Sequence, residues 1–127
     1  MKNNQLMIYG AYGYAGELMV REAVAQGLRP IIAGRDDEKL KPIATELSLE
    51  CRAFGVRNTG SNLQDISVLL NCAGPFSATA EPLARACLAQ QIHYLDITGE
   101  IDIFRKCHAL DEEARQQNVL ILPGAGT

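Results

Sequence analysis

Short runs of hydrophobic residues alternate along the chain with longer segments in which hydrophobic positions recur three and four residues apart. The short runs predict strands, and the longer amphipathic segments predict helices. Strands are expected at Gln5–Tyr9, Arg29–Ala33, Glu50–Val56, Ser67–Ala73, Ile92–Ile97 and Val119–Leu122. Helices are expected at Tyr14–Gln26, from the three acids at 36–38 through Leu47, at Ala80–Gln90 and at Ile101–Gln117.

The ends of these helices carry recognisable signals. Gly27 suits the position just after the first helix, and the acids at 36–38 suit the positive end of the second helix dipole. Ser77 or Thr79 is expected to cap the third helix. Between the third and fourth strands, residues 57–62 are expected to form a loop with at most one helical turn, at Asn62–Ile66.

The predicted strands are apolar throughout, without the alternation of polar and apolar residues that a half-exposed strand shows. Such strands are typical of a parallel sheet covered by helices on both faces. Right-handed crossovers then give a doubly wound α/β fold, Rossmann-like, with six strands in the order 3-2-1-4-5-6. The 127 residues fit a single domain, 1–127. Its last strand would lie at a sheet edge and need cover from a partner or a further domain.

Composition narrows the classes of function. The net charge of −3 and the pI near 5.3 provide no basic surface for nucleic acid or for an anionic membrane. No apolar run approaches the roughly 18 residues of a membrane span. The four cysteines include no C-x-x-C pair and only two histidines are present, so we expect no metal site and no disulfide. Reduced cysteines favour a cytoplasmic location.

A glycine-rich turn lies between the first predicted strand and the first predicted helix. Gly10 allows a sharp turn, Gly13 allows a pyrophosphate to approach the backbone, and Gly16 allows the helix to pack closely. The first N–H groups of that helix would face the anion. Tyr14 either directs its hydroxyl to a phosphate or packs on the surface, and the alternative for the whole motif is a purely structural turn.

The end of the second strand points to the choice of cofactor. NAD-binding domains commonly place an acid here, whereas this chain has Gly34 and then Arg35, about 20 residues past the turn. A guanidinium can pair with a 2′-phosphate, and Gly34 leaves space for it, so NADP is favoured over NAD. The alternative is an Arg35 paired with Asp37 or Glu38. Asp36 and Asp37 are expected to cap the next helix.

The fourth strand ends in a further candidate segment, Asn71, Cys72, Ala73, Gly74 and Pro75. Its small residues would let the ribose and pyrophosphate of the cofactor pass close over the loop, and Gly74-Pro75 fixes a turn. Cys72 could be taken for a nucleophile, but no histidine neighbours it in the sequence, and a buried, inert thiol is favoured.

The fifth strand is followed by a second polar segment. Asp96 or Thr98 either caps the long helix, or Asp96 or Glu100 lies at the rim of a nicotinamide site. His93 and His108 are expected to be structural or solvated. The sequence therefore yields no candidate catalytic residue.

Several of these segments together resemble one family. The stretches "GAYGYAGEL", "AGR", "LLNCAGPFSATAEPL", "HYLDITGE" and "LPGAG" are similar to the N-terminal dinucleotide-binding domain of saccharopine dehydrogenase-like oxidoreductases, in the subgroup that includes trans-acting enoyl reductases. The resemblance implies an NAD(P)-dependent oxidoreductase in which a catalytic and dimerising domain follows. It assigns the phosphate-binding turn to Gly10, Gly13 and Gly16, NADP selection to Arg35, and the cofactor loop to residues 72–75.

Two departures from that family pattern stand out. Tyr12 and Ala15 occupy positions where the turn usually carries small hydroxyl residues, which would remove two phosphate hydrogen bonds and add bulk beside the pyrophosphate. The expected substrate domain is absent, so we expect no turnover from this chain alone. It would act with a separate substrate domain, or alternatively as a stand-alone or homodimeric NADP(H)-binding or redox-sensing module. A short-chain dehydrogenase is disfavoured because no Tyr-x-x-x-Lys pair exists.

Overall fold

The computed structural model describes residues 5–97, 110–116 and 119–122. The strands are β1 (Gln5–Tyr9), β2 (Ile31–Gly34), β3 (Cys51–Ala53), β4 (Ile66–Asn71), β5 (His93–Asp96) and β6 (Ile121–Leu122). The helices are α1 (Tyr14–Ala25), α2 (Asp37–Leu47), α3 (Phe76–Ala89) and α5 (Asp111–Gln116), with short 3₁₀ turns η1 (Val56–Asn58) and η2 (Gly60–Asn62).

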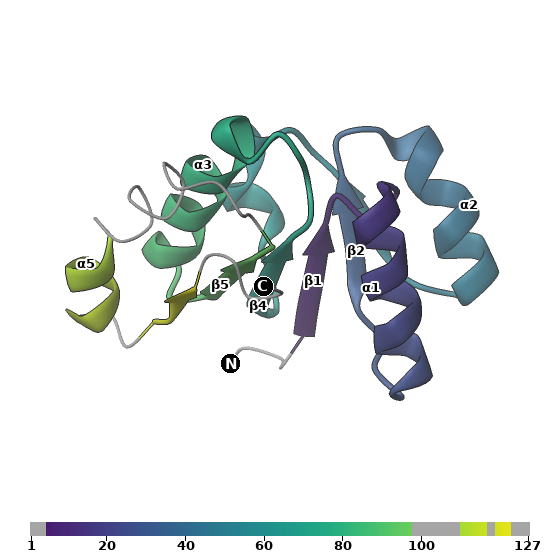
Figure 1. Cartoon of the computed structure of the whole chain (residues 1–127), viewed down its shortest axis with the longest axis horizontal. Helices are drawn as coiled ribbons and strands as arrows, with labels where there is room; N and C mark the ends of the chain where they lie inside the picture. The colour runs from purple at the N-terminus through teal and green to yellow at the C-terminus, as the bar shows by residue number, and fades with distance from the viewer. Residues whose placement is uncertain (1–4, 98–109, 117–118, 123–127) are drawn as a thin grey trace.

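All the strands pair in parallel in one sheet with the order β3-β2-β1-β4-β5-β6 (Figure 1). This is the predicted Rossmann-like order, and it is confirmed. The register aligns Tyr9 with both Ala33 and Asn71, and Asn71 with Asp96. The strand order reverses at β1, because β2 and β4 flank it. The carboxyl ends of β1, β2, β4 and β5 therefore meet at one edge, where ligands bind in open α/β sheets.

Two hydrophobic clusters cover the two faces of the sheet. One joins α3 and α5 to β1, β4 and β5, with Met7, Leu69, Leu83 and Tyr94 fully buried. The other joins α1 and α2 to the opposite face, and Figure 1 shows these two helices beside β1 and β2. Burial on both faces explains why the strands read as continuous apolar runs.

The helix boundaries show which sequence signals were informative. Asp36 caps α2, because its carboxylate accepts the Glu38 N–H at 3.0 Å. Gly27 follows Gln26, the C-cap residue of α1, and has φ +88, a conformation that glycine adopts easily. Both features were predicted. By contrast, the expected cap of α3 by Ser77 or Thr79 is wrong.

The start of α3 lies earlier than its sequence suggested. Helical hydrogen bonding begins where the Ala78 N–H donates to the Pro75 carbonyl. Pro75 occupies the N-cap position, and no side-chain hydrogen bond caps the helix. The Thr79 hydroxyl donates instead to the Ala73 carbonyl at 2.8 Å. Phe76, the first residue of α3, packs against the hydrophobic cluster between that helix and the sheet.

Other elements are shorter than predicted or fall outside the described residues. The third strand ends at Ala53, and the chain then forms η1 and η2 in place of one turn at Asn62–Ile66. Of the predicted helix at Ile101–Gln117, only α5 is described. Thr98, Glu100 and His108 lie outside the described residues. Among the described helices, none is long and apolar enough to cross a membrane.

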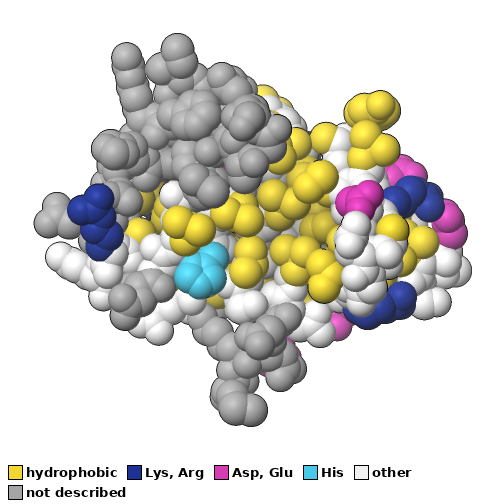
Figure 2. Space-filling view, turned by 60° about the horizontal axis from the view of Figure 1, so that its bottom comes forward, with side chains coloured by type: hydrophobic (Ala, Val, Ile, Leu, Met, Phe, Trp, Pro, Cys, Tyr) yellow, Lys and Arg dark blue, Asp and Glu magenta, His cyan; other side chains and the backbone are white. Residues whose placement is uncertain are grey.

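Hydrophobic side chains are also exposed on the outside of the molecule. Tyr14, Leu18 and Met19 on α1 are exposed, as are Leu28 and Leu120. Figure 2 shows hydrophobic side chains gathered across the middle of the face that it presents. An apolar area of this kind is a common feature of surfaces that contact another protein segment.

Candidate dinucleotide-binding site

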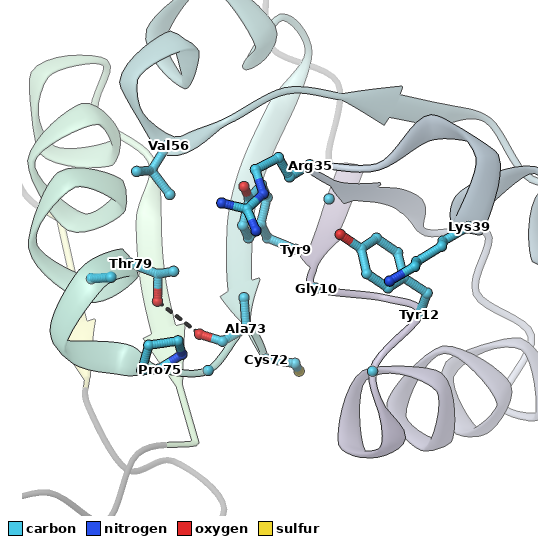
Figure 3. Close-up of a pocket in the computed structure, with 14 residues that line it drawn as sticks. Tyr9, Gly10, Tyr12, Arg35, Lys39, Val56, Cys72, Ala73, Pro75 and Thr79 are labelled. Atoms are coloured by element: carbon cyan, nitrogen blue, oxygen red, sulfur yellow. Dashed lines mark hydrogen bonds between the residues drawn. The ribbon is translucent and has the colours of Figure 1, made fainter.

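A cleft of about 340 Å³ opens at the carboxyl ends of β1, β2 and β4 (Figure 3). Its walls come from the turn after β1, the turn after β2, the start of η1 and the loop between β4 and α3. The lining residues are Tyr9, Gly10, Tyr12, Gly13, Gly34, Arg35, Lys39, Val56, Cys72, Ala73, Gly74, Pro75, Ala78 and Thr79. Segments that are far apart in the sequence thus converge on one hollow.

The glycine turn is packed so closely that side chains would not fit at two of its positions. Gly10 has φ +83, and a Cβ there would lie 2.7 Å from the backbone nitrogen of Ala73. A Cβ on Gly16 would overlap the Gly10 carbonyl. The N–H groups of Gly10 and Ala11 both donate to the Ala33 carbonyl, which fixes the turn against β2. The roles predicted for the first and third glycines match this geometry.

The first turn of α1 begins beside the cleft with no side-chain cap. Gly13 is the residue before the helix and lines the cleft, and a Cβ there would lie 3.5 Å from the Gly10 carbonyl oxygen, an ordinary van der Waals distance. The first N–H groups of a helix lack intrahelical partners and are oriented to bind an anion. Tyr14, Ala15 and Gly16 stand outside the cleft lining, and Tyr14 is 86% exposed. The side chains of Tyr14 and Ala15 do not line the cleft, and the backbone N–H groups of all three residues belong to the first turn of α1.

The Tyr12 side chain lies across the end of β2. Its hydroxyl accepts the Asp36 N–H at 3.2 Å, and a Cβ on Gly34 would come within 2.5 Å of its ring. The space beside Gly34, which was expected to accommodate the cofactor, is therefore filled by this ring. The Lys39 ammonium lies 5.5 Å from the centre of the ring, within cation–π range.

Two cations lie at this end of the cleft, Arg35 and Lys39 (Figure 3). Within the described ranges, no ion pair engages Arg35, so the alternative pairing with Asp37 or Glu38 is not what the structure has. Asp37 pairs with Lys41 at 3.1 Å, and Asp36 caps α2. Asp36 and Asp37 are thus held by groups of α2, and both cations line the cleft.

Small residues of the loop after β4 form the opposite wall. Cys72, Ala73, Gly74 and Pro75 all line the cleft, as the sequence predicted. Burial and the nearby Asp96 carboxylate raise the pKa of the Cys72 thiol to about 11. A thiol with such a pKa is neutral at physiological pH and is a poor nucleophile, in agreement with the inert role expected for it.

Asn71 lies below the cleft and is fully buried. It was predicted as part of the cofactor loop, but it reaches the loop through a hydrogen bond from the Ala73 N–H to its Oδ1, at 2.9 Å. Asp96, also fully buried, accepts a 2.6 Å hydrogen bond from the Tyr94 hydroxyl. His93 begins β5, and its Nδ1 accepts the Leu120 N–H at 2.9 Å, a structural role.

Sequence reasoning missed five lining residues, and their signals differ. Lys39 lies in the first turn of α2, four residues after Arg35, which precedes the helix; a second cation so close to Arg35 in the sequence could have identified it. Tyr9 lies at the end of a predicted strand beside the glycine turn. Val56, Ala78 and Thr79 reach the cleft only because η1 and α3 fold over the sheet edge, and no local pattern marks them.

Three features together define a Rossmann dinucleotide-binding domain. They are a parallel sheet with a cleft where the strand order reverses, a glycine turn that leads into a helix without a side-chain cap, and a cation at the end of β2. Sequence comparison places it more narrowly. The family model "Saccharopine dehydrogenase NADP binding domain" matches residues 6–122. The chain belongs to this family of NADP-binding domains, which confirms both the resemblance and the cofactor expected from Arg35.

Curated relatives show the same relationship. The rat saccharopine dehydrogenase-like oxidoreductase is 26% identical over 96% of this chain and 34% of its own length. A putative trans-acting enoyl reductase of Mycobacterium tuberculosis is 26% identical over 87% of this chain and 30% of its own length. A lipid droplet localized protein of Caenorhabditis elegans is 22% identical over 99% of this chain and 34% of its own length. This chain thus spans about a third of each relative.

Among solved structures, apo saccharopine dehydrogenase (L-Glu forming) from Saccharomyces cerevisiae superposes with a TM-score of 0.81 at 12% identity. The match covers 98% of this chain and 27% of the yeast protein. At this level of identity the match establishes the fold.

Proposed function

We propose that this domain holds NADP in the cleft for an oxidoreductase reaction whose substrate is bound by a domain outside residues 1–127. The observation that carries the proposal is the convergence of the glycine turn, the uncapped start of α1 and two cations on one cleft. When bound, the nicotinamide ring would supply hydride transfer. The chain's own residues bind and orient the cofactor.

The shape of the cleft fits a dinucleotide. Gly10 and Gly16 are packed too closely for side chains, whereas a Cβ on Gly13 would be 3.5 Å from the Gly10 carbonyl oxygen, an ordinary contact. Because Gly13 lines the cleft and carries no side chain, a pyrophosphate can approach its backbone near the N–H groups of α1. Arg35 and Lys39 would bind the 2′-phosphate, because both line the cleft and the carboxylates of Asp36 and Asp37 are engaged with groups of α2. The loop 72–75 would face the nicotinamide half.

The described part of the cleft supplies no evident proton donor for a substrate. The Tyr9 hydroxyl donates to the Phe54 carbonyl at 2.9 Å, the Thr79 hydroxyl donates to the Ala73 carbonyl, and the Cys72 thiol is buried with a raised pKa. Arg35 and Lys39 lie at the end assigned to the 2′-phosphate. This supports a division of labour in which a second domain brings substrate and proton, and we expect no turnover by this chain alone.

Cofactor titration tests the proposal. We expect NADPH to raise the melting temperature more than NADH at equal concentration, because a ligand that binds only the folded state stabilises it. Arg35→Ala should remove most of this preference and Lys39→Ala part of it. Arg85→Ala, which removes an exposed cation of α3 outside the cleft lining, should leave the preference unchanged.

Equal shifts with NADPH and NADH would refute the assignment of Arg35. Absence of a shift with either cofactor would refute cofactor binding by this chain. Reduction of a carbonyl, imine or enoyl substrate by the purified protein alone would contradict the expected division of labour.

A second candidate is a stand-alone NADP(H)-binding or redox-sensing module that acts through a partner or as a homodimer. The exposed hydrophobic side chains of α1 and the apolar area in Figure 2 favour it. Analytical ultracentrifugation with and without NADPH tests this candidate, which predicts a stable dimer or a cofactor-dependent association without turnover. A monomer at all concentrations, with a substrate domain encoded immediately downstream, would favour the first candidate.

We further propose a cytoplasmic location, supported by cysteines without disulfide spacing. The C. elegans relative is named for lipid droplets. Cell fractionation tests the location: co-purification with membranes or droplets would contradict it.

A further inference from the structure

Four side chains from three elements form a hydrogen-bonded network beneath the loop between β4 and α3. Asn71 Nδ2 lies 3.1 Å from both the Thr79 hydroxyl and the Tyr94 hydroxyl. The Tyr94 hydroxyl lies 2.6 Å from the Asp96 carboxylate. Asn71 Oδ1 accepts the Ala73 N–H, and the Thr79 hydroxyl donates to the Ala73 carbonyl. Asn71, Tyr94 and Asp96 are fully buried.

The hydrogen bonds of this network have only one consistent direction. The Ala73 amide can only donate, so the oxygen of the Asn71 carboxamide must face it. Both Nδ2 hydrogens then go to the Thr79 and Tyr94 hydroxyls. Each hydroxyl, having accepted from Asn71, donates onward, to the Ala73 carbonyl and to Asp96 respectively. The carboxamide orientation is therefore fixed by the network itself.

The consequence for the loop is that both polar backbone groups of Ala73 are engaged. Ala73 lies against Gly10, since a Cβ on that glycine would come within 2.8 Å of the Ala73 Cα and Cβ. The loop therefore presents Ala73, Gly74 and Pro75 to the cleft mainly as apolar surface of fixed shape (Figure 3). A buried, fully satisfied polar network of this kind makes a local structure rigid.

We propose that Asn71 is the positioning residue for the cofactor loop, acting with Thr79 on Ala73 and anchored to β5 through Tyr94 and Asp96. The network sets the width of the cleft between Gly10 and the loop, at the half of the site that would receive the nicotinamide end. This inference rests on the proposed binding of NADP. The cations Arg35 and Lys39 lie on other elements and have no hydrogen bond to the network among the described residues.

This separation gives the test its two probes. NADPH occupies both halves of the proposed site, whereas adenosine 2′,5′-bisphosphate occupies only the half at Arg35 and Lys39. We expect Thr79→Val, which removes the hydroxyl and keeps the shape, to weaken NADPH binding about tenfold in isothermal titration calorimetry. Binding of the bisphosphate should change less than about twofold. Thr79→Ser restores the hydroxyl and should recover NADPH affinity to within about threefold of the unmodified protein.

Asn71→Ala should produce the same selective loss, with a larger effect on NADPH binding. Circular dichroism checks that this variant is folded. If it is not folded, the binding data for Thr79→Val test the proposal. The proposal is overturned if Thr79→Val binds NADPH as tightly as the unmodified protein, if Thr79→Ser fails to restore binding, or if both probes weaken equally. Failure of the proposed function looks different, because the unmodified protein would then bind neither probe.

Discussion

Tyr12 shows how one side chain changes the interpretation of a motif. Its position inside the glycine turn suggested bulk beside a pyrophosphate, but its ring extends toward β2, against Gly34, and its hydroxyl accepts the Asp36 N–H. The ring also lies under Lys39. Tyr12 therefore ties the turn after β1 to the start of α2, where the two candidate 2′-phosphate ligands stand.

This packing predicts a coupling between Gly34 and Tyr12. Gly34→Ala should lower the free energy of unfolding by about 1–3 kcal/mol, because the added methyl meets the Tyr12 ring and overpacks the site. In a Tyr12→Ala background the same substitution should cost at least about 1 kcal/mol less. Urea denaturation of the four proteins of this double-mutant cycle measures the coupling, and additive costs would contradict the contact.

At the level of elements, the starts of the helices divide into two kinds. Asp36 caps α2, whereas α1 and α3 begin after Gly13 and Pro75 without a side-chain cap, and both of those residues line the cleft. A helix start without a cap retains N–H groups that can bind a ligand. Both uncapped helix starts thus lie at the cleft, while α2, whose Lys39 also lines it, begins with a cap.

The parallel pairing of β4 and β5 has a consequence for Cys72. It brings the ends of the two strands together, so that the Asp96 carboxylate adds to burial in raising the Cys72 pKa to about 11. Because a raised pKa favours the neutral thiol, the thiolate is scarce at pH 8. We expect the rate of alkylation by iodoacetamide to rise about tenfold per pH unit up to that pKa.

Peptide mapping by mass spectrometry measures this rate, with the half-buried Cys51 as the internal comparison. Cys51 should be modified first at pH 8. A Cys72 rate that levels off near pH 8.5 would contradict the raised pKa. The raised pKa of Cys72 also affects stability. Burial of the neutral thiol contributes fully to the free energy of unfolding below the unfolded-state pKa, and this contribution is lost as the pH rises through the higher folded-state pKa.

At the scale of the whole molecule, the chain corresponds to only part of the length of its relatives. It contains the NADP-binding domain of its family and spans about a third of its curated relatives. Its described cleft has groups to hold a dinucleotide. The Tyr9 and Thr79 hydroxyls in it donate to backbone carbonyls, the Cys72 thiol is buried with a raised pKa, and Arg35 and Lys39 lie at the proposed 2′-phosphate end. Binding and catalysis are therefore expected to depend on different parts of the family's architecture.

The sequence alone determined the sheet order, the glycine turn, the cap at Asp36 and the position of Arg35 after β2, because each depends on a local or periodic signal. Apolar runs reveal buried strands, glycine spacing reveals a close backbone approach, and a cation after β2 has a fixed place in the fold. The start of α3 was missed because Thr79 bonds the backbone of Ala73, before the helix, and does not cap it.

Only the tertiary structure decided which way side chains point and which of them meet. It directed Tyr12 onto Gly34, placed Val56 and Thr79 in the cleft, and joined Asn71 to Tyr94, which lies 23 residues further along the chain. These contacts depend on how helices from distant parts of the sequence fold over one edge of the sheet. Local sequence patterns do not encode such long-range contacts, so the part of the cleft wall that comes from η1 and α3 follows only from the tertiary structure.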